Sequence, residues 1–319
     1  MQALVFDGKK VTQRQIDKPT PSTDEALIKV IYSGVCNTDL EIAEGYMNFT
    51  GVIGHEFVGV VETCADKTWL GKRVVGEINC GCNECDYCRK GLSRHCPNRT
   101  VLGILNRDGV HANYVTLPQQ NLHLVPETVS DEAAAFTEPL AAALEIFAQV
   151  HPQTGAAITV IGDGKLGQLI ALTLNLYSVD LTVVGKHRAK LDLLQERGII
   201  VQKPNHLRLP PQDVVVECSG AADGLRFATA LLKPQGTLVL KSTYHNNVLF
   251  NPAIWVINEI MVVGSRCGPF APALQLLEKK MIEPEFLIAH IVDSQSAINA
   301  LRLAQQKDVL KVLIDWREN

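Results

Sequence analysis

The sequence lacks the features that would indicate a nucleic-acid-binding surface. Its Lys and Arg residues are scattered, with no basic run that contains interleaved aromatic residues, and its formal net charge is −4. Proteins that bind nucleic acid concentrate positive charge on one face. We therefore expect no nucleic-acid partner.

Long apolar runs are also missing. No stretch reaches the about 18 uninterrupted apolar residues that are typical of a membrane span. The first residues, MQALVFDGKK, contain neither the apolar core nor the small-residue cleavage site of a signal peptide. We expect a cytoplasmic protein with no membrane partner. The sequence shows no internal repeat and no low-complexity segment.

What is present indicates a globular protein of two domains. A chain of 319 residues exceeds what one hydrophobic core comfortably accommodates. Hydrophobic residues make up 46% of the chain and charged residues 20%, which is usual for a folded protein.

The first part of the chain is rich in short strands. Alternating or β-branched runs, separated by Gly, Pro, Asp and Asn, occur at 3–6, 26–32, 57–62 and 73–78. Short strands with this turn punctuation are typical of an irregular antiparallel barrel or sandwich.

Beyond about residue 140 the pattern changes to alternating strands and helices, which predicts a parallel sheet with helices on both faces. Two more helical stretches, 272–281 and 294–306, precede a last strand at 311–315. The expected strands are 156–161, 180–185, 213–218 and 237–242, and the expected helices are 165–177, one that stops at Gly198, and 222–232. The fold class is therefore α/β.

Cysteines provide the first functional signal. Five of the nine lie between Cys80 and Cys96, in the run CGCNECDYCRKGLSRHC. Clustering in a long chain favours a metal over a disulfide framework. Four thiolates can enclose zinc with no position left for water, as in a structural site. The spacing C-x2-C-x2-C-x7-C selects Cys82, Cys85, Cys88 and Cys96 as ligands.

Other interpretations of this cluster remain open. The cysteines could be unligated loop residues, or they could hold an iron–sulfur cluster. Cys80 lies outside the regular spacing but could replace one of the four ligands.

A glycine-rich turn follows the strand at 156–161. Gly162, Gly164 and Gly167 form G-x-G-x-x-G, with Lys165 and Leu166 inside the motif. Between a strand and a helix, this motif brings backbone and a helix amino terminus to a dinucleotide pyrophosphate. The alternative is an ordinary tight turn.

The end of the next strand bears on the choice of cofactor. NAD enzymes usually place Asp or Glu there to bind the ribose 2′-hydroxyl. Here the position is Gly185, followed by Lys186, His187 and Arg188. A small residue before cations suits a 2′-phosphate, so we expect NADP rather than NAD. Alternatively, these charges only solvate the start of a helix.

Three short segments complete the candidate residues: GVCNTDLE at 34–41, GHEFVG at 54–59 and FTEPLAAA at 136–143. Taken singly, each residue has an ordinary structural interpretation. Cys36 would be a small buried hydrophobe, His55 and Glu56 would be a hydrogen-bonded pair, and Glu138 would simply lie near a helix start.

Together with the cysteine cluster and the glycine turn, these segments resemble the zinc-containing medium-chain alcohol dehydrogenases, in particular the sorbitol, threonine and glucose dehydrogenase-like members. The resemblance extends through VVGSRCG and LKVLI over nearly the whole chain. It implies a GroES-like β-rich catalytic domain interrupted by a Rossmann domain. The expected boundaries are 1–140 for the catalytic domain, 141–266 for the Rossmann NAD(P)-binding domain, and 267–319 for the return to the catalytic domain.

The resemblance also assigns roles to single residues. It implies a catalytic zinc held by Cys36 and His55, with Glu138 as a further ligand and Glu56 as a ligand or a neighbour of the metal. Thr38 would contact the alcohol hydroxyl and Asp39 would support the His ligand. The cofactor would contact Gly162, Gly164, Lys165, Leu166, Gly167, Gly185, Lys186, Arg188 and Ser219.

The implied activity is zinc-dependent hydride transfer between a nicotinamide cofactor and an alcohol, a polyol or the corresponding carbonyl, with two zincs per chain. The implied assembly is a homodimer or homotetramer that pairs near 255–264. One departure is Glu41, which stands where many relatives have a proton-relaying His. Two alternatives are a non-catalytic NADP-binding redox sensor and a zinc-free quinone or enoyl reductase.

Overall fold

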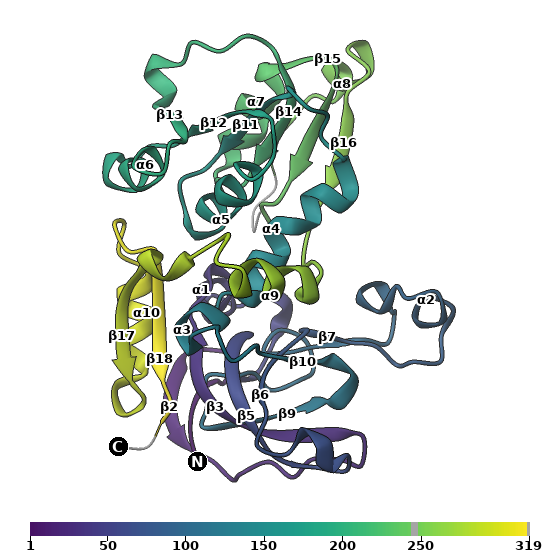
Figure 1. Cartoon of the computed structure of the whole chain (residues 1–319), viewed down its shortest axis with the longest axis vertical. Coiled ribbons are helices and arrows are strands. Elements are labelled where there is room, and N and C mark those ends of the chain that lie inside the picture. The colour runs from purple at the N-terminus through teal and green to yellow at the C-terminus, as the bar shows by residue number, and fades with distance from the viewer. Residues whose placement is uncertain (244–247, 318–319) are drawn as a thin grey trace. The chain divides into compact units, whose positions relative to one another are not determined.

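The structure of the protein, a computed structural model, describes residues 1–243 and 248–317. The chain divides into two compact units (Figure 1). Unit 1 is Met1–Glu138 with Leu274–Asn319, and unit 2 is Pro139–Ala273. The sequence placed the corresponding borders after residues 140 and 266. Unit 2 is thus an insertion in unit 1.

The main sheet of unit 1 has, among the described residues, the strand order β10-β6-β5-β3-β18-β17, and β9 also pairs with β3. Its neighbours run antiparallel except β17 and β18, which are parallel. The strands are β3 (Glu25–Gly34), β5 (Glu56–Cys64), β6 (Arg73–Gly76), β9 (Tyr114–Pro118), β10 (Leu122–Leu124), β17 (Ile288–Asp293) and β18 (Lys311–Asp315).

The ten-residue strand β3 organises this sheet. One edge of β3 pairs with β5 along most of its length. The other edge is shared: residues 25–29 pair with β9, and residues 32–34 pair with β18. The carboxyl end of β3 therefore lies between the beginning of β5 and the last strand of the chain.

Smaller elements complete unit 1. A three-stranded sheet has the order β2-β1-β4, and β7 pairs with β8. Two helices, α4 (Thr137–Val150) and α9 (Phe270–Glu278), continue across the borders of the units. The remaining elements are β1 (Gln2–Phe6), β2 (Val11–Gln15), β4 (Gly51–Val52), β7 (Asn79–Cys80), β8 (Thr100–Val101), α1 (Asn37–Ala43), α2 (Asp86–Arg89), α3 (Asp131–Ala134) and α10 (Ile298–Ala304).

Unit 2 contains one six-stranded sheet in which every pair of neighbours is parallel. Its order, β13-β12-β11-β14-β15-β16, is the 3-2-1-4-5-6 arrangement of dinucleotide-binding sheets. Its elements are β11 (Ala157–Ile161), α5 (Lys165–Leu174), β12 (Asp180–Val184), α6 (Arg188–Gln195), β13 (Ile200–Gln202), β14 (Gln212–Glu217), α7 (Ala222–Leu231), β15 (Leu232–Leu240), α8 (Ala253–Ile257) and β16 (Met261–Gly264).

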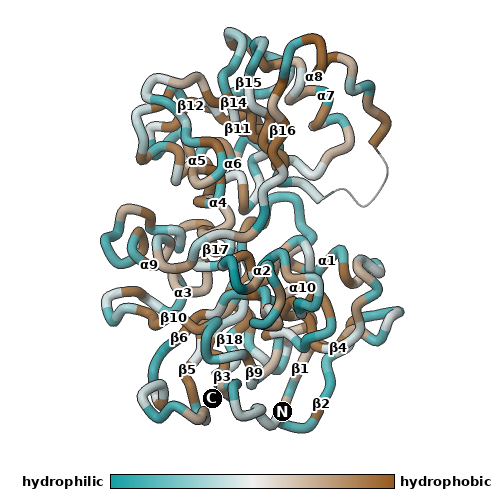
Figure 2. Tube along the Cα trace, turned by 90° about the vertical axis from the view of Figure 1, so that its right-hand side faces the viewer, coloured by the Kyte–Doolittle hydropathy of each residue, from teal (hydrophilic) through white to brown (hydrophobic). Residues whose placement is uncertain are grey.

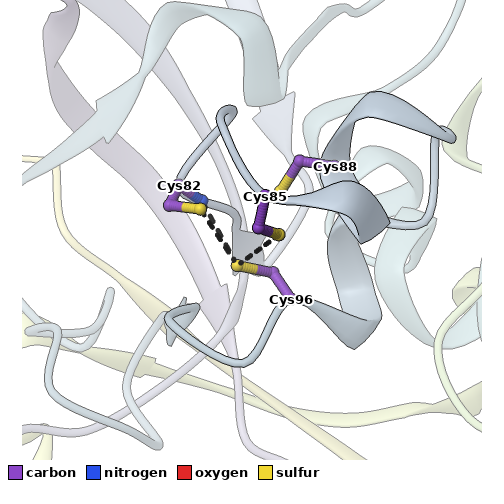
Figure 3. A group of neighbouring side chains, drawn as sticks. All are labelled: Cys82, Cys85, Cys88 and Cys96. Atoms are coloured by element: carbon purple, nitrogen blue, oxygen red, sulfur yellow. Dashed lines mark hydrogen bonds between the residues drawn. The ribbon is translucent and has the colours of Figure 1, made fainter.

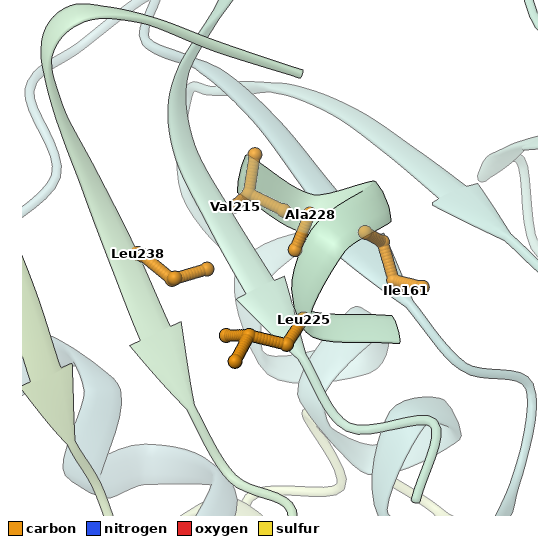
Figure 4. Packing of buried hydrophobic residues seen from close by; sticks show 5 residues of the cluster. All are labelled: Ile161, Val215, Leu225, Ala228 and Leu238. Carbon is orange, nitrogen blue, oxygen red and sulfur yellow. The ribbon is translucent and has the colours of Figure 1, made fainter. Parts of the chain in front are cut away.

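Burial on both faces explains the apolar composition of these strands. Val160 and Ile161 of β11, adjacent residues that point to opposite faces, are 0% and 5% exposed, as expected for a parallel strand covered on both sides. On one face, Leu225 and Ala228, three residues apart on α7, pack against Val215 of β14 (Figure 4). The helical period thus directs one side of α7 to the sheet.

The predicted α/β fold class is confirmed, with differences at element ends. The helix expected at 165–177 ends at Leu174. The helix expected at 294–306 begins only at Ile298, because Asp293 accepts a hydrogen bond from the Gln295 backbone and caps a separate 3-10 turn before it. In the described part of the chain, no helix has the length and apolar character needed to cross a membrane.

Candidate functional site

The pairing of β3 with β5 gathers three of the predicted metal ligands. Gly34 at the end of β3 pairs with Glu56 at the start of β5, so the residues after β3 lie beside those before β5. One ligand atom from each of Cys36, His55 and Glu56 lies within 4.8 Å of the other two. His55 and Glu56 are buried and Cys36 is half-buried.

Asp39 holds this group together from the first turn of α1. Its Oδ2 accepts a hydrogen bond of 2.7 Å from the Cys36 backbone N–H, and its Oδ1 lies 3.3 Å from Nδ1 of His55. A carboxylate beside one ring nitrogen orients a ligating histidine. With Nδ1 turned to Asp39, Nε2 is the nitrogen of His55 that remains for a metal.

The electrostatics of the group favour a positive charge. Burial lowers the pKa of His55, but the negative charges of Asp39 and Cys36 outweigh it and raise the pKa well above 6.5. Burial raises the pKa of Asp39, but His55 and His111 outweigh it and bring the pKa far below its usual range. Zinc binds thiolate, imidazole and carboxylate donors. Without a metal, the surrounding negative charges favour a proton on His55. A zinc ion, which is also positively charged, therefore fits the same donors.

A second buried histidine lies behind Asp39. The Nε2 of His111 is 3.4 Å from Oδ2 of Asp39, and its Nδ1 is 2.8 Å from the Ser33 hydroxyl. The indole N–H of Trp316 donates to the same hydroxyl at 2.7 Å. These groups are completely buried, so they fix the position of the carboxylate that orients His55.

Glu56 has a partner of opposite charge. Its Oε2 forms a salt bridge with Nζ of Lys311, the first residue of β18, and both side chains are 1% exposed. A Cβ atom at Gly34 would lie 2.5 Å from that carboxylate oxygen. The absence of a side chain at Gly34 therefore leaves room for the ion pair.

The other expected catalytic residues have separate surroundings. Thr38 lies on α1 with its hydroxyl 3.9 Å from the Cys36 sulfur. Glu41 follows one turn later on the same helix. Glu138 lies in the first turn of α4 and is outside the group of three close ligand atoms. Its role as a ligand stays a prediction.

The four cysteines with regular spacing meet in a lobe between β7 and β8 (Figure 3). Their sulfur atoms lie within 4.8 Å of one another, and Cys96 is 3.5 Å from Cys82 and 3.7 Å from Cys85. A tetrahedral zinc with bonds of about 2.3 Å places its sulfur ligands about 3.8 Å apart. The lobe therefore fits a four-thiolate zinc.

Cys80 is not part of that group. It ends β7, is 5% exposed, and burial raises the pKa of its thiol to about 11. At Cys82 the backbone N–H groups of Glu84 and Cys85 lower the thiol pKa to about 6. Burial also raises the pKa of the Cys88 thiol to about 11, so it is the position of its sulfur, outside the close group of four, that separates Cys80 from the ligands.

The glycine turn of unit 2 has the geometry of a pyrophosphate-binding loop. Gly162 has a φ of +129°, and a Cβ atom there would lie 2.8 Å from the Cys218 carbonyl oxygen. A Cβ at Gly167 would lie 2.1 Å from the Gly162 carbonyl oxygen, whereas one at Gly164 would meet nothing within 4 Å. The first and third glycines thus permit close packing, and the second leaves open space at the amino end of α5, where a phosphate fits.

The remaining expected cofactor residues lie at the carboxyl ends of neighbouring strands. Gly185 follows β12, and Lys186 leads into α6. Arg188 pairs along its own helix, 2.6 Å from Asp192 and 2.8 Å from the Gln195 oxygen. Ser219 follows β14 and donates to Glu217. The carboxyl ends of parallel strands are where such sheets bind nucleotides.

Several residues of these sites were not identified from the sequence. Lys311 and His111 come from a strand and a loop far from the zinc motifs, and Ser33 directly precedes the GVCNTDLE segment. The available signal was a charged or polar residue within an apolar stretch, such as the lysine of VLKVLI at 309–314. Asp163, between the first two glycines, is a fourth example.

Comparison with known proteins places the chain in a family. Residues 22–127 match the alcohol dehydrogenase GroES-like domain. The chain is 32% identical to the sorbitol dehydrogenase of Halalkalibacterium halodurans over 324 residues, which cover 93% of this chain and 94% of that one. The chain belongs to the zinc-containing medium-chain alcohol dehydrogenases. It is accordingly an NAD(P)-dependent enzyme of the sorbitol-like branch of that family.

Solved structures of medium-chain dehydrogenases resemble this chain closely. A zinc-binding dehydrogenase from Sinorhizobium meliloti 1021, bound to NADP, superposes with a TM-score of 0.90 at 26% identity and covers 98% of both chains. The RspB alcohol dehydrogenase of Escherichia coli CFT073, complexed with NADH, has a TM-score of 0.88 at 26% identity and covers 99% of both. Relatives of similar identity thus bind either cofactor.

Proposed function

We propose that this chain is a zinc-dependent polyol dehydrogenase whose catalytic metal is bound by Cys36 and His55. The observation that carries the proposal is the convergence of Cys36, His55 and Glu56, with ligand atoms within 4.8 Å of one another. The sorbitol dehydrogenase at 32% identity supports a polyol as the substrate. The reaction is hydride transfer between a substrate carbinol carbon and the nicotinamide.

The residues around the ligands support separate roles in the reaction. Zinc at these donors supplies Lewis-acid polarisation of the substrate oxygen. Thr38, with its hydroxyl 3.9 Å from the Cys36 sulfur, accepts the proton of the alcohol. Asp39 keeps His55 in its ligating orientation, and His111 keeps Asp39 in place. Glu41, one turn after Thr38 on α1, stands at the position where many relatives have a proton-relaying His.

The third protein ligand is a carboxylate. Glu56 belongs to the close group, but its Oε2 is bound to Lys311. Glu138 occupies the position that the family resemblance assigns to a ligand. Zinc content of Glu56→Gln and Glu138→Gln separates the two, because only the ligand variant loses about one zinc per chain.

The test of the proposed function measures zinc per chain together with NAD(P)-dependent oxidation of sorbitol, xylitol and arabitol. We expect two zincs, one in the cysteine lobe and one at Cys36 and His55, and turnover of at least one polyol. The matched variant His55→Ala keeps the lobe zinc and loses turnover. One zinc per chain in the wild type, or unchanged turnover in His55→Ala, contradicts the proposal.

The expectation of NADP, drawn from the sequence, receives less support from the structure than the expectation of zinc. Gly185 and Lys186 favour a 2′-phosphate. Arg188 is engaged with Asp192 and Gln195 along α6, and His187 is engaged with Asp163. Two of the three cations expected to bind the phosphate therefore already have acidic or polar partners. Direct binding of NAD and NADP to the same sample decides the preference.

We further propose that two copies pair through β16, at the end of the sheet of unit 2. Apolar side chains on and before this strand are exposed: Met261 is 61% exposed, Ile257 79% and Val256 78%. Figure 2 shows β16 as a hydrophobic segment. Exposed apolar edge strands readily pair with another chain. We expect Met261→Lys to shift the mass measured by light scattering to that of the monomer; the exposed Ile200→Lys, on the strand at the opposite sheet edge, is the control.

A further inference from the structure

Asp163, the residue between the first two glycines of the turn, carries a buried carboxylate at the nucleotide end of the sheet of unit 2. Its Oδ2 accepts a hydrogen bond of 2.6 Å from the backbone N–H of His187, and its Oδ1 lies 2.9 Å from Nδ1 of the same residue. Only 8% of the Asp163 side chain is exposed. The carboxylate is thus held in a defined position while part of it remains accessible to a ligand.

That position is the one a side chain at Gly185 would occupy. A Cβ atom built on Gly185 would lie 2.5 Å from Oδ2 of Asp163 and 2.6 Å from its Cβ. Gly185 directly follows β12, the strand after the glycine turn. In dinucleotide-binding sheets, the residue at the end of this strand supplies the carboxylate that binds the ribose 2′-hydroxyl. Here the carboxylate reaches the same place from the glycine turn.

The cationic residues that follow Gly185 do not offset the repulsion between the Asp163 carboxylate and a 2′-phosphate. His187 contributes its backbone N–H and one ring nitrogen to Asp163. Arg188 lies 2.6 Å from Asp192, four residues along α6. A 2′-phosphate at the end of β12 would therefore meet a fixed carboxylate, while two of the three following cations are directed to acidic partners. Like charges at such short range repel, and burial weakens the screening.

We propose that Asp163 determines the cofactor of this enzyme by accepting hydrogen bonds from the adenosine ribose hydroxyls and excluding a 2′-phosphate, so that NAD is preferred to NADP. The inference rests on the proposed binding of the dinucleotide at Gly162–Gly167. It reverses the preference that Gly185 and the three cations predict from the sequence, because in space the missing acidic residue is replaced by Asp163.

A purely structural role of Asp163 makes a different prediction. If the carboxylate only anchors the turn between β12 and α6 through His187, its loss weakens NAD and NADP binding alike. A carboxylate that contacts the ribose instead strengthens NAD binding and weakens NADP binding. The ratio of the two dissociation constants is therefore the informative quantity.

The experiment titrates the full-length purified protein with NAD and, separately, with NADP by isothermal calorimetry, without any substrate. We expect the wild type to bind NAD more tightly. We expect Asp163→Asn to weaken NAD binding and strengthen NADP binding, and to change their ratio by about tenfold or more, since a hydrogen bond to a charged group is worth at least that factor.

Two further variants make the result specific. Asp180→Asn removes an exposed carboxylate from the opposite end of β12 and leaves the ratio unchanged. His187→Ala removes the imidazole but keeps the carboxylate, so we expect this variant to prefer NAD. It also tests the proposal if Asp163→Asn fails to fold. A wild type that prefers NADP, an unchanged ratio in Asp163→Asn, or a His187→Ala that loses the preference for NAD overturns the proposal. If the wild type binds neither dinucleotide, the proposed function itself is wrong, and this inference fails with it.

Discussion

The two candidate zinc sites of unit 1 are built in opposite ways. The cysteine lobe takes its four ligands from residues 82–96, a single loop between two short paired strands. The other site takes Cys36 from the end of β3 and His55 from the start of β5, and its Glu56 is paired with Lys311, 255 residues further along the chain. The first site depends on local spacing, and the second depends on the assembled sheet.

This difference predicts which property of the protein, stability or activity, each metal would affect most. In the lobe, a zinc bound by the four cysteines would contribute folding energy directly, because all its ligands lie on the loop that it would fix. At Cys36 and His55 the surrounding sheet is already formed by the pairing of β3, β5 and β18. Loss of metal from the lobe should therefore change stability most, and loss from the other site should change activity most.

The largest effect is expected at the assembled site. Cys36→Ala removes a metal ligand and lowers kcat for polyol oxidation by about 10³-fold or more, since transition-state stabilisation by a bound metal amounts to several kcal/mol. The melting temperature changes little. Cys64→Ala, at a buried cysteine in the same unit, is the control and retains activity; equal losses in both variants would contradict a metal role for Cys36.

In the lobe we expect the reverse. Cys96→Ser removes a zinc ligand, abolishes binding of one zinc per chain, and lowers the melting temperature by about 5 °C or more, because a metal that binds only the folded lobe stabilises it. Calorimetry and metal analysis on the same preparation measure both. Cys80→Ala provides the comparison, because it leaves the four sulfur ligands in place; loss of zinc in that variant would instead make Cys80 a ligand.

The ion pair of the assembled site gives an intermediate effect. Lys311→Met leaves the carboxylate of Glu56 buried without its partner, which costs about 3–5 kcal/mol in the free energy of unfolding. Adding Glu56→Gln removes the unpaired charge and recovers part of this loss. Urea unfolding of both single variants and the double variant yields the coupling energy, and additive effects would show that the pair is unimportant.

The smallest effect concerns pH in zinc-free protein. The pKa of His55 is raised on folding, so its protonated form stabilises the fold below its unfolded pKa of about 6.5. This contribution disappears as the pH rises through the folded value. His55→Gln therefore lowers the free energy of urea unfolding of the zinc-free protein more at pH 6 than at pH 9. An equal cost at both pH values would indicate that Asp39 does not hold a proton on His55.

Much of this organisation could be predicted from the sequence, because it depends on local patterns. The alternation of strands and helices from residue 156 onwards predicted the parallel sheet, since a helix in each connection allows successive strands to run in the same direction. The cysteine spacing predicted a group of four sulfur atoms, since three of them are three residues apart and the fourth is eight residues further on the same loop.

The parts that could not be predicted depend on which strands become neighbours. Nothing local to Lys311 indicates that β18 lies beside β3, and therefore that its ammonium group reaches Glu56. The same holds for Asp163 and Gly185, which are 22 residues apart and share one space only because β11 and β12 are adjacent. Sequence patterns identify a missing carboxylate at one position, but not its replacement from another strand.

The division of one edge of β3 between β9 and β18 also has a consequence for biosynthesis. When a ribosome has completed Cys36, His55 and Glu56, the strand that supplies the neutralising lysine does not yet exist, and the whole of unit 2 is still to be translated. Unit 2, whose sheet comes from one continuous segment, contains all its strands earlier. The buried surroundings of Cys36, His55 and Glu56 are therefore completed only after every strand of unit 2 has been made.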